Sequence, residues 1–253
     1  MIRGLYTSAT GMMVQRNRMD VLTNNIVNIE TTGYKKDTLL TTPFDEVMLQ
    51  RKNDPNIDIY GGNFVGPYSF GTHVDELITN FVQGNLEQTS RTTDLAIAGE
   101  GFFVIETPAG ERYTRAGNFA VNSEGYLVTG DGNYVLGENG RIYVGSTDFS
   151  VSVDGTITGE YAEPNRLRIV TFEDTGVLRK EGSTLYSIYG GAQPVEAEGY
   201  SVRQGMQESS NVDAASEMVD LISLYRKYEA NQRALKMTDE TLGLAVKLGS
   251  ING

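Results

Sequence analysis

The sequence contains no cysteine and only one histidine, His73, in 253 residues. Without cysteine no disulfide can form, and a zinc site cannot reach its usual number of Cys and His ligands. A Ser-His-Asp triad would have to use His73, which we expect in a loop or at the start of a strand. Catalysis needs an activated nucleophile, paired carboxylates in a cleft or a metal. We therefore expect no catalytic site, no metal and no cofactor.

Basic residues are also scarce. There are 21 Lys and Arg against 33 Asp and Glu, and the net charge is −12. This balance disfavours binding to nucleic acid or to an anionic membrane surface. No window approaches 18 uncharged apolar residues, so we expect no membrane insertion. The opening residues 1–6 lack the apolar run of a secretory signal, so export would need a route that cleaves no signal peptide.

The composition that remains is globular. Hydrophobic residues make up 39% and charged residues 21% of the chain, which excludes a disordered protein. The sequence has 29 Gly and 14 Tyr but only 6 Pro. This combination favours many turns and strands.

Residues 1–30 have the periodicity of an amphipathic helix. One row of apolar residues recurs every seven positions, at Leu5, Met12, Met19 and Ile26. A second row consists of Ile2, Ala9, Leu22 and Ile29, with Arg16 interrupting it. Such a stripe predicts a helix about 40 Å long. Thr31, Thr32 and Gly33 should end it, because β-branched residues and glycine favour leaving the helix.

The other end of the chain predicts a matching helix. Ser209 to Asn211 offers capping side chains, and Gly249 is a plausible end. Between them, apolar residues follow in steps of three and four at Ala214, Met218, Leu221, Tyr225, Tyr228, Leu235, Leu242 and Val246.

The region 81–207 reads as a series of short strands separated by glycine-rich turns. We expect a sharp turn at residues 99–101 between two buried strands, and a two-residue hairpin at Asp154-Gly155. The regular spacing of turns predicts a sandwich or an irregular barrel. The fold class is therefore α+β, with a coiled-coil-like helical domain from both termini and an all-β middle domain.

Residues 37–80 have weaker periodicity and are interpreted as a linker, with loops at 53–56 and 61–63. Its aromatic residues suit either sugar stacking or, more commonly, packing of a loop onto a domain; they are Tyr60, Phe64, Tyr68 and Phe70. The predicted division is an N-terminal helix with its stop (1–36), the linker (37–80), the β-rich domain (81–207) and the C-terminal helix (208–253).

Two amphipathic helices at opposite ends of one chain need cover for their stripes. They can pair with each other, but the apolar residues spread wider than one seam, and neighbouring copies would cover the rest. A monomeric helical hairpin packed on the β domain is the alternative. The residues assigned to an assembly interface are Leu5, Met12, Met19, Leu22, Asn24, Asn25, Ile26, Asn28, Met218, Leu221, Tyr225, Tyr228, Leu235 and Leu242.

Four segments carry a resemblance to a known family. They run through Leu22-Thr23-Asn24-Asn25-Ile26-Val27-Asn28-Ile29-Glu30-Thr31-Thr32-Gly33-Tyr34-Lys35, residues 93–103, residues 113–119, and residues 210–231. In this order they resemble flagellar rod and hook proteins over nearly the whole chain. One such segment alone would be weak, whereas four that span both ends and the middle are specific.

The resemblance implies a rod or hook subunit that the flagellar type III apparatus exports and that assembles with its own kind and with neighbouring subunits. It places the protein in the basal body, in the periplasm or cell wall. The helices would form an inner layer around a channel, and the length favours the rod, without deciding between its distal and proximal parts. Asn24, Asn25 and Asn28 would then fix register between copies, or else form a solvated helix end.

A β-rich module that binds the cell wall or cleaves its glycan is the competing hypothesis. Such a module has no need of matched stripes at both ends. Removing residues 1–30 separates the two hypotheses, because a structural subunit would lose assembly while its β domain stayed folded.

Overall fold

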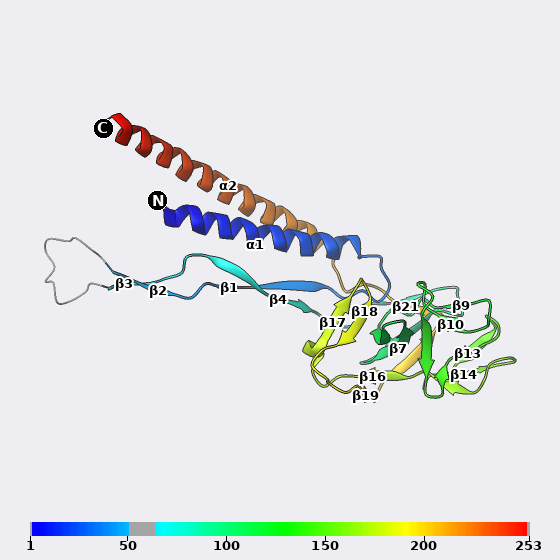
Figure 1. Cartoon of the computed structure of the whole chain (residues 1–253). Coiled ribbons are helices and arrows are strands. Elements are labelled where there is room, and N and C mark those ends of the chain that lie inside the picture. Colours follow the sequence, from blue (N-terminus) through cyan, green and yellow to red (C-terminus); the bar gives the residue numbers. More distant parts are fainter. Residues whose placement is uncertain (1, 51–63, 252–253) are drawn as a thin grey trace. The chain divides into compact units, whose positions relative to one another are not determined.

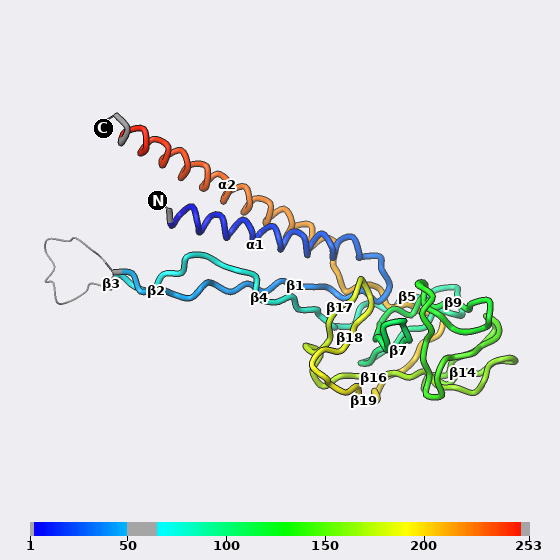
Figure 2. The backbone as a smooth tube through the Cα atoms, in the orientation of Figure 1, coloured from blue at the N-terminus to red at the C-terminus, as the bar shows by residue number. Residues whose placement is uncertain are grey.

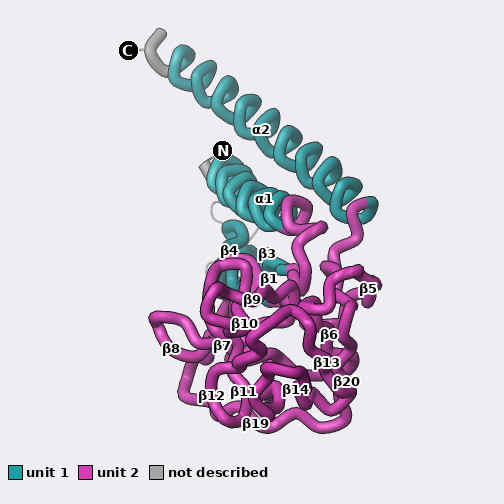
Figure 3. Tube along the Cα trace, turned by 90° about the vertical axis from the view of Figure 1, so that its right-hand side faces the viewer, with its two compact units in different colours: residues 1–24, 37–78, 215–253 teal, residues 25–36, 79–214 magenta. Residues whose placement is uncertain are grey.

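The computed structural model describes residues 2–50 and 64–251. The chain divides into two compact units, coloured separately in Figure 3. We call residues 1–24, 37–78 and 215–253 the helical unit, and residues 25–36 and 79–214 the β unit. Both ends of the chain contribute helices to the helical unit, and the β unit consists mostly of strands. The predicted α+β class is therefore confirmed.

Two long helices make up most of the helical unit. Helix α1 spans Ile2–Val27 and helix α2 spans Ala214–Ile251. They run alongside each other in opposite directions, with the start of α1 lying beside the later part of α2 (Figure 1). The predicted stop at Gly249 was wrong, since α2 continues through it to Ile251; one glycine costs a helix only about 1 kcal/mol.

The segment interpreted as a linker contains four strands in its described part. Strand β1 (Asp37–Pro43) pairs with β4 (Thr72–Thr79), and β2 (Val47–Gln50) pairs with β3 (Phe64–Tyr68). The segment therefore runs out and back on itself, as the tube in Figure 2 shows. Periodicity was weak here because a narrow two-stranded ribbon has little to bury. The expected loops at 53–56 and 61–63, and Tyr60, lie outside the described residues.

The largest sheet of the β unit has ten strands, and β7 lies near its centre. Its main path runs β17-β18-β8-β7-β11-β10-β9; β12 pairs with β11, β16 with β7, and β19 with β16. The bounds are β7 Phe102–Thr107, β8 Gly110–Thr114, β9 Ala120–Val121, β10 Leu127–Val128, β11 Tyr134–Gly137, β12 Gly140–Arg141, β16 Ile169–Thr171, β17 Leu178–Glu181, β18 Leu185–Ile188 and β19 Val195–Glu196, with a short 3-10 helix at Thr175–Val177. The path has two free ends, so among the described strands this sheet forms no closed barrel.

Three smaller sheets complete the β unit. The first has three strands, β13 Phe149–Val151, β14 Thr156–Gly159 and β15 Asn165–Arg166. The second pairs β6 Leu95–Ala98 with β20 Ser201–Gln204, and the third pairs β5 Leu86–Gln88 with β21 Met206–Glu208. The β13–β14 hairpin is confirmed. The expected two-residue loop was wrong: Val151 pairs with Ile157 and Ser152 N donates to Thr156 O, which leaves a loop of three residues, Val153 to Gly155. The turn at 99–101 joins β6 to β7, but these strands lie in different sheets.

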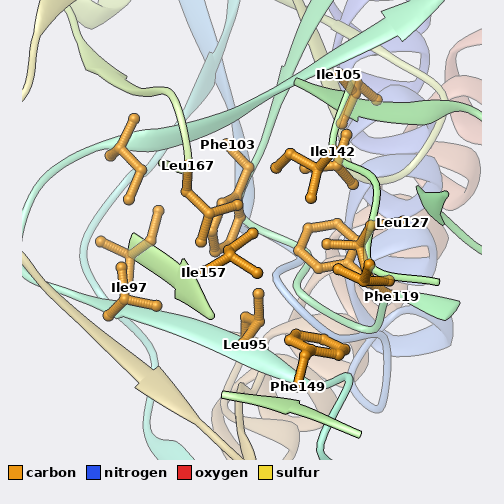
Figure 4. Packing of buried hydrophobic residues seen from close by; sticks show 14 residues of the cluster. Leu95, Ile97, Phe103, Ile105, Phe119, Leu127, Ile142, Phe149, Ile157 and Leu167 are labelled. Atoms are coloured by element: carbon orange, nitrogen blue, oxygen red, sulfur yellow. The ribbon is translucent and has the colours of Figure 1, made fainter. Parts of the chain in front are cut away.

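Alternation along β7 explains its unbroken apolar run. Phe103 and Ile105 belong to one buried cluster, while Phe102 and Val104 belong to a second. Successive side chains of a strand point to opposite faces, so β7 separates two cores and is buried on both sides. The first cluster, shown in Figure 4, gathers residues from strands far apart in sequence.

Candidate assembly surface

Helix α1 contacts α2 through small residues. A Cβ added at Gly4 would lie 3.7 Å from Thr238 Cγ2, and one added at Gly11 would lie 3.0 Å from Asn231 Nδ2. Gly4 and Gly11 are seven residues apart, as are Thr238 and Asn231, so both contacts belong to one antiparallel seam. The absence of side chains at these positions allows the two helices to approach closely.

The apolar row predicted on α1 flanks this seam. Leu5, Met12, Met19 and Ile26 are all half-buried in the single chain, and so is Leu22. The row is therefore only partly covered by α2. The predicted α2 residues divide into two groups. Leu221, Tyr228, Leu235 and Leu242 are half-buried, whereas Met218 and Tyr225 remain 53% and 56% exposed.

Sequence periodicity missed the one buried apolar residue among the described side chains of α2. Leu224 is buried, although it stands outside the predicted stripe. Its spacing of seven from Asn231, and of fourteen from Thr238, places it on the same seam. The seven-residue spacing could have identified Leu224 from the sequence. It was not recognised because the other two members of the row, Asn231 and Thr238, are polar.

The three asparagines of the signature occupy different environments. Asn25 is buried in the β unit, where its Oδ1 accepts a hydrogen bond from the Tyr34 hydroxyl at 3.0 Å. Asn28 is half-buried and accepts from Thr31 Oγ1 at 3.2 Å, while Asn24 is exposed. The role of these amides between copies stays a prediction, and Asn25 already has a partner within its own chain.

Further apolar residues on both helices face solvent. On α1, Tyr6, Met13 and Val27 are exposed at seven-residue and fourteen-residue spacing, and Met13 is 68% exposed. On α2 the exposed apolar residues are Met218, Val219, Ile222, Tyr225, Met237, Leu244, Val246 and Leu248. This many exposed apolar residues on two helices is typical of an interaction surface.

A buried cluster of charges lies where the signature segments meet in the β unit. Lys35 Nζ donates to Glu208 Oε1 at 2.5 Å and to Val82 O at 2.9 Å, and neither Lys35 nor Glu208 is exposed. Arg115 Nη1 lies 3.5 Å from the other carboxylate oxygen of Glu208 and donates to Gly99 O at 2.9 Å. Two buried cations thus share one buried carboxylate.

Burial sets the protonation balance of this cluster. Loss of hydration lowers the pKa of Lys35, and the nearby Glu208 carboxylate opposes that effect. Burial likewise lowers the pKa of Arg115, again against the attraction of Glu208. Charged groups removed from water are costly unless they are paired. Glu208 is therefore the counter-charge on which both cations depend.

Hydrogen bonds around this cluster join the segment after α1 to the segment before α2. Gly33 N donates to Glu208 O at 2.7 Å, and Lys36 N donates to Asn211 Oδ1 at 2.7 Å. Gly33 has φ = 70°, and a Cβ there would lie 2.3 Å from Ala116 N. The sequence identified Gly33 only as a helix stop and Asn211 only as a capping side chain, and it gave Glu208 no role, because pairing between residues 173 apart has no local signal.

His73 and the aromatic residues of 37–80 make packing contacts in the helical unit. The His73 ring stacks on Phe44 with centroids 5.1 Å apart, and Tyr68 meets Phe70 edge-on at 5.4 Å. Thr7 Oγ1 on α1 donates to Phe70 O at 3.3 Å. A second hydrogen bond, from Arg18 Nη2 to Thr41 Oγ1 of β1 at 2.7 Å, also joins this segment to α1.

The described residues contain no group of three or more His, Asp or Glu side chains placed to hold a metal ion. Among the helices that the structure describes, none is long and apolar enough to cross a membrane.

Comparison with known proteins gives three family matches in chain order. Residues 5–35 match the flagella basal body rod protein family, residues 96–159 match the D1 domain of the flagellar hook protein FlgE/F/G, and residues 203–248 match the C-terminal part of the flagellar basal body rod FlgEFG proteins. These ranges include Gly11, Asn231 and Thr238 of the seam and all three charged residues of the cluster, Lys35, Arg115 and Glu208.

Full-length relatives agree. The chain is 34% identical to the flagellar basal-body rod protein FlgG of Bacillus subtilis, over 98% of this chain and 99% of the relative. It is 34% identical to the flagellar basal-body rod protein FlgF of Caulobacter vibrioides over the whole of both chains, and 30% identical to the hook-basal body complex protein FlhO of Bacillus subtilis. The family matches run through both terminal helices and the β-rich middle of the sequence, and they place the chain among the flagellar basal-body proteins. It belongs to the flagellar basal-body rod protein family.

Proposed function

We propose that this protein is a structural subunit of the flagellar basal-body rod, which polymerises through its terminal helices and transmits torque for motility. The single observation that carries the proposal is the set of exposed apolar residues on α1 and α2. Exposed apolar residues on a monomer are normally scattered singly, whereas here they recur along both helices. Family membership supports the rod as the structure that it builds.

The assembly interface in this proposal consists of the residues predicted from sequence. Apart from Asn25, which is buried, those on α1 and the half-buried residues of α2 keep uncovered parts that are available to neighbouring rod or hook subunits. The four predicted segments would serve as inner helix, connecting ribbon, outer β domain and second inner helix. Export through the flagellar type III apparatus and the absence of catalytic activity also belong to the proposal, and family membership supports both.

The decisive experiment is removal of the gene from its host. We expect cells that do not swim and basal bodies whose rod, seen by electron microscopy, stops before its normal end. Expression of the chain lacking residues 2–24 should fail to restore swimming, although the β unit, which begins at Asn25, remains folded. Normal swimming without the chain would overturn the proposal, and release of muropeptides from purified peptidoglycan would favour a glycan-cleaving module instead.

A further inference from the structure

The exposed side of α1 carries an acidic residue in an apolar row. Tyr6, Met13 and Val27 are exposed, and Asp20 occupies the remaining position of their seven-residue repeat. Each of Tyr6 and Met13 follows a seam glycine by two residues, which places this outer row about 200° around the helix from the seam. Asp20 is exposed and has no ion-pair partner in the described parts of the chain.

The exposed side of α2 has a basic counterpart. A surface hollow there is lined by Val219, Ile222, Ser223, Arg226, Lys227 and Ala230. Ile222 and Arg226 lie about 180° and 140° around α2 from the seam residue Asn231. Arg226 and Lys227 are exposed, and neither forms an ion pair with a residue that the structure describes. An apolar hollow bordered by two unpaired cations fits an apolar row that carries one carboxylate.

We propose that the outer row of α1 in one copy packs into this hollow on α2 of a second copy, with Asp20 paired to Arg226. The proposal rests on the proposed function and adds to it the surface, the partner and the register. An unpaired carboxylate in an apolar row is costly to bury. It therefore favours a partner helix that has a cation at the same position along the helix axis.

The direction of packing follows from the helix pair itself. Within one chain α1 and α2 run antiparallel. Copies that point the same way along a rod therefore bring α1 of one against α2 of the next in antiparallel sense as well. With Asp20 opposite Arg226, seven residues in opposite directions bring Val27 opposite Val219. Both are apolar and exposed, so the charged pair and the apolar pair agree on one register.

This register differs from the one within the chain. The seam places Gly11 opposite Asn231, which aligns residue 20 with residue 222. Pairing Asp20 with Arg226 shifts the neighbouring α2 by four residues, about 6 Å or one helical turn. Successive copies would then be staggered along the helix axis by about this amount, as a helical assembly requires.

Charge reversal in the living cell tests the pairing. In a strain that lacks its own copy, Asp20→Arg and Arg226→Glu should each reduce swimming at least about tenfold, because two like charges meet in a packed interface. The combination Asp20→Arg with Arg226→Glu should restore swimming to near the wild-type level. Asp131→Arg and Arg203→Glu change exposed charges on the β unit and should leave swimming unchanged.

The absence of cysteine permits a direct distance test. A chain with Asp20→Cys and a chain with Arg226→Cys, expressed together, should form disulfide-linked dimers in isolated basal bodies, since that bond needs Cα atoms about 4.4–6.8 Å apart. Asp20→Cys with Glu240→Cys should not, because position 240 lies about 21 Å further along α2.

The outcomes separate the two proposals. Single reversals that swim like the wild type, a double reversal that fails to recover, or a missing 20–226 crosslink would overturn the pairing and leave the rod subunit standing. Normal swimming in the strain without the chain would overturn the proposed function itself.

Discussion

Glu208, the last residue of β21, is the only described carboxylate within hydrogen-bonding distance of Lys35, although 173 residues separate them. It also faces Arg115 and accepts a hydrogen bond from Gly84 N at 2.9 Å. One carboxylate thus joins the chain leaving α1, a β-unit loop and the chain entering α2. The cluster holds together both connections between the β unit and the terminal helices.

Removing both partners of this ion pair should cost less than the two single losses added together. Lys35→Met leaves the Glu208 carboxylate buried with Arg115 alone, and Glu208→Met leaves two buried cations without a counter-charge. We expect each to lower the free energy of unfolding by about 3–5 kcal/mol. The double variant should lose clearly less than the sum. Urea unfolding followed by circular dichroism measures all four proteins, and additive losses would show that the two side chains are not coupled.

The same lysine predicts a dependence of stability on alkaline pH. The folded-state pKa of Lys35 is lowered from its ordinary value of 10.5. Between these two pKa values the unfolded chain binds more protons at this site, so its contribution favours folding increasingly as pH rises. The stability of the wild type relative to Lys35→Met should therefore increase across that window. A constant or falling difference in urea titrations would contradict the assigned direction.

A comparison of Gly33 with Gly182 separates the cost of a steric clash from the cost of backbone strain. Gly33→Ala places a Cβ 2.3 Å from Ala116 N at φ = 70°, whereas Gly182→Ala has nearly the same φ, 72°, with nothing within 4 Å. We expect Gly182→Ala to cost about 1–2 kcal/mol from φ alone. Gly33→Ala should cost clearly more, because the backbone must also move. Thermal melting of both variants compares them, and equal losses would mean that the close approach to Ala116 is relaxed at no cost.

The helix seam can be tested by a second glycine pair. Gly243 on α2 has open space around it, so Gly243→Ala should stabilise α2 by about 0.5–1 kcal/mol. Gly11→Ala brings a Cβ to 3.0 Å from Asn231 Nδ2, and this contact should cancel the same gain. Gly11→Leu should separate the helices and abolish swimming. Circular dichroism at 222 nm reports the helix effects, and a fully assembling Gly11→Leu variant would exclude a close seam.

The amino-acid sequence by itself determined the two helices, the strand-rich middle and the row Leu5, Met12, Met19 and Ile26, because each depends on periodicity within a few turns of chain. The same local evidence, together with the four signature segments in order, was sufficient to identify the family. It could not separate the two faces of α1, since Tyr6 and Met13 repeat every seven residues just as Leu5 and Met12 do.

Only the tertiary structure decided which apolar row borders the seam, because that depends on Gly4 and Gly11, which carry no hydrophobic signal. It also decided that residues 37–50 and 64–79 form paired strands and that Lys35, Arg115 and Glu208 share one buried site. The physical reason is the same in each case. Hydrogen bonds between strands and ion pairs between residues distant in sequence form only where the fold brings those residues together. No short stretch of sequence shows which distant residues will meet.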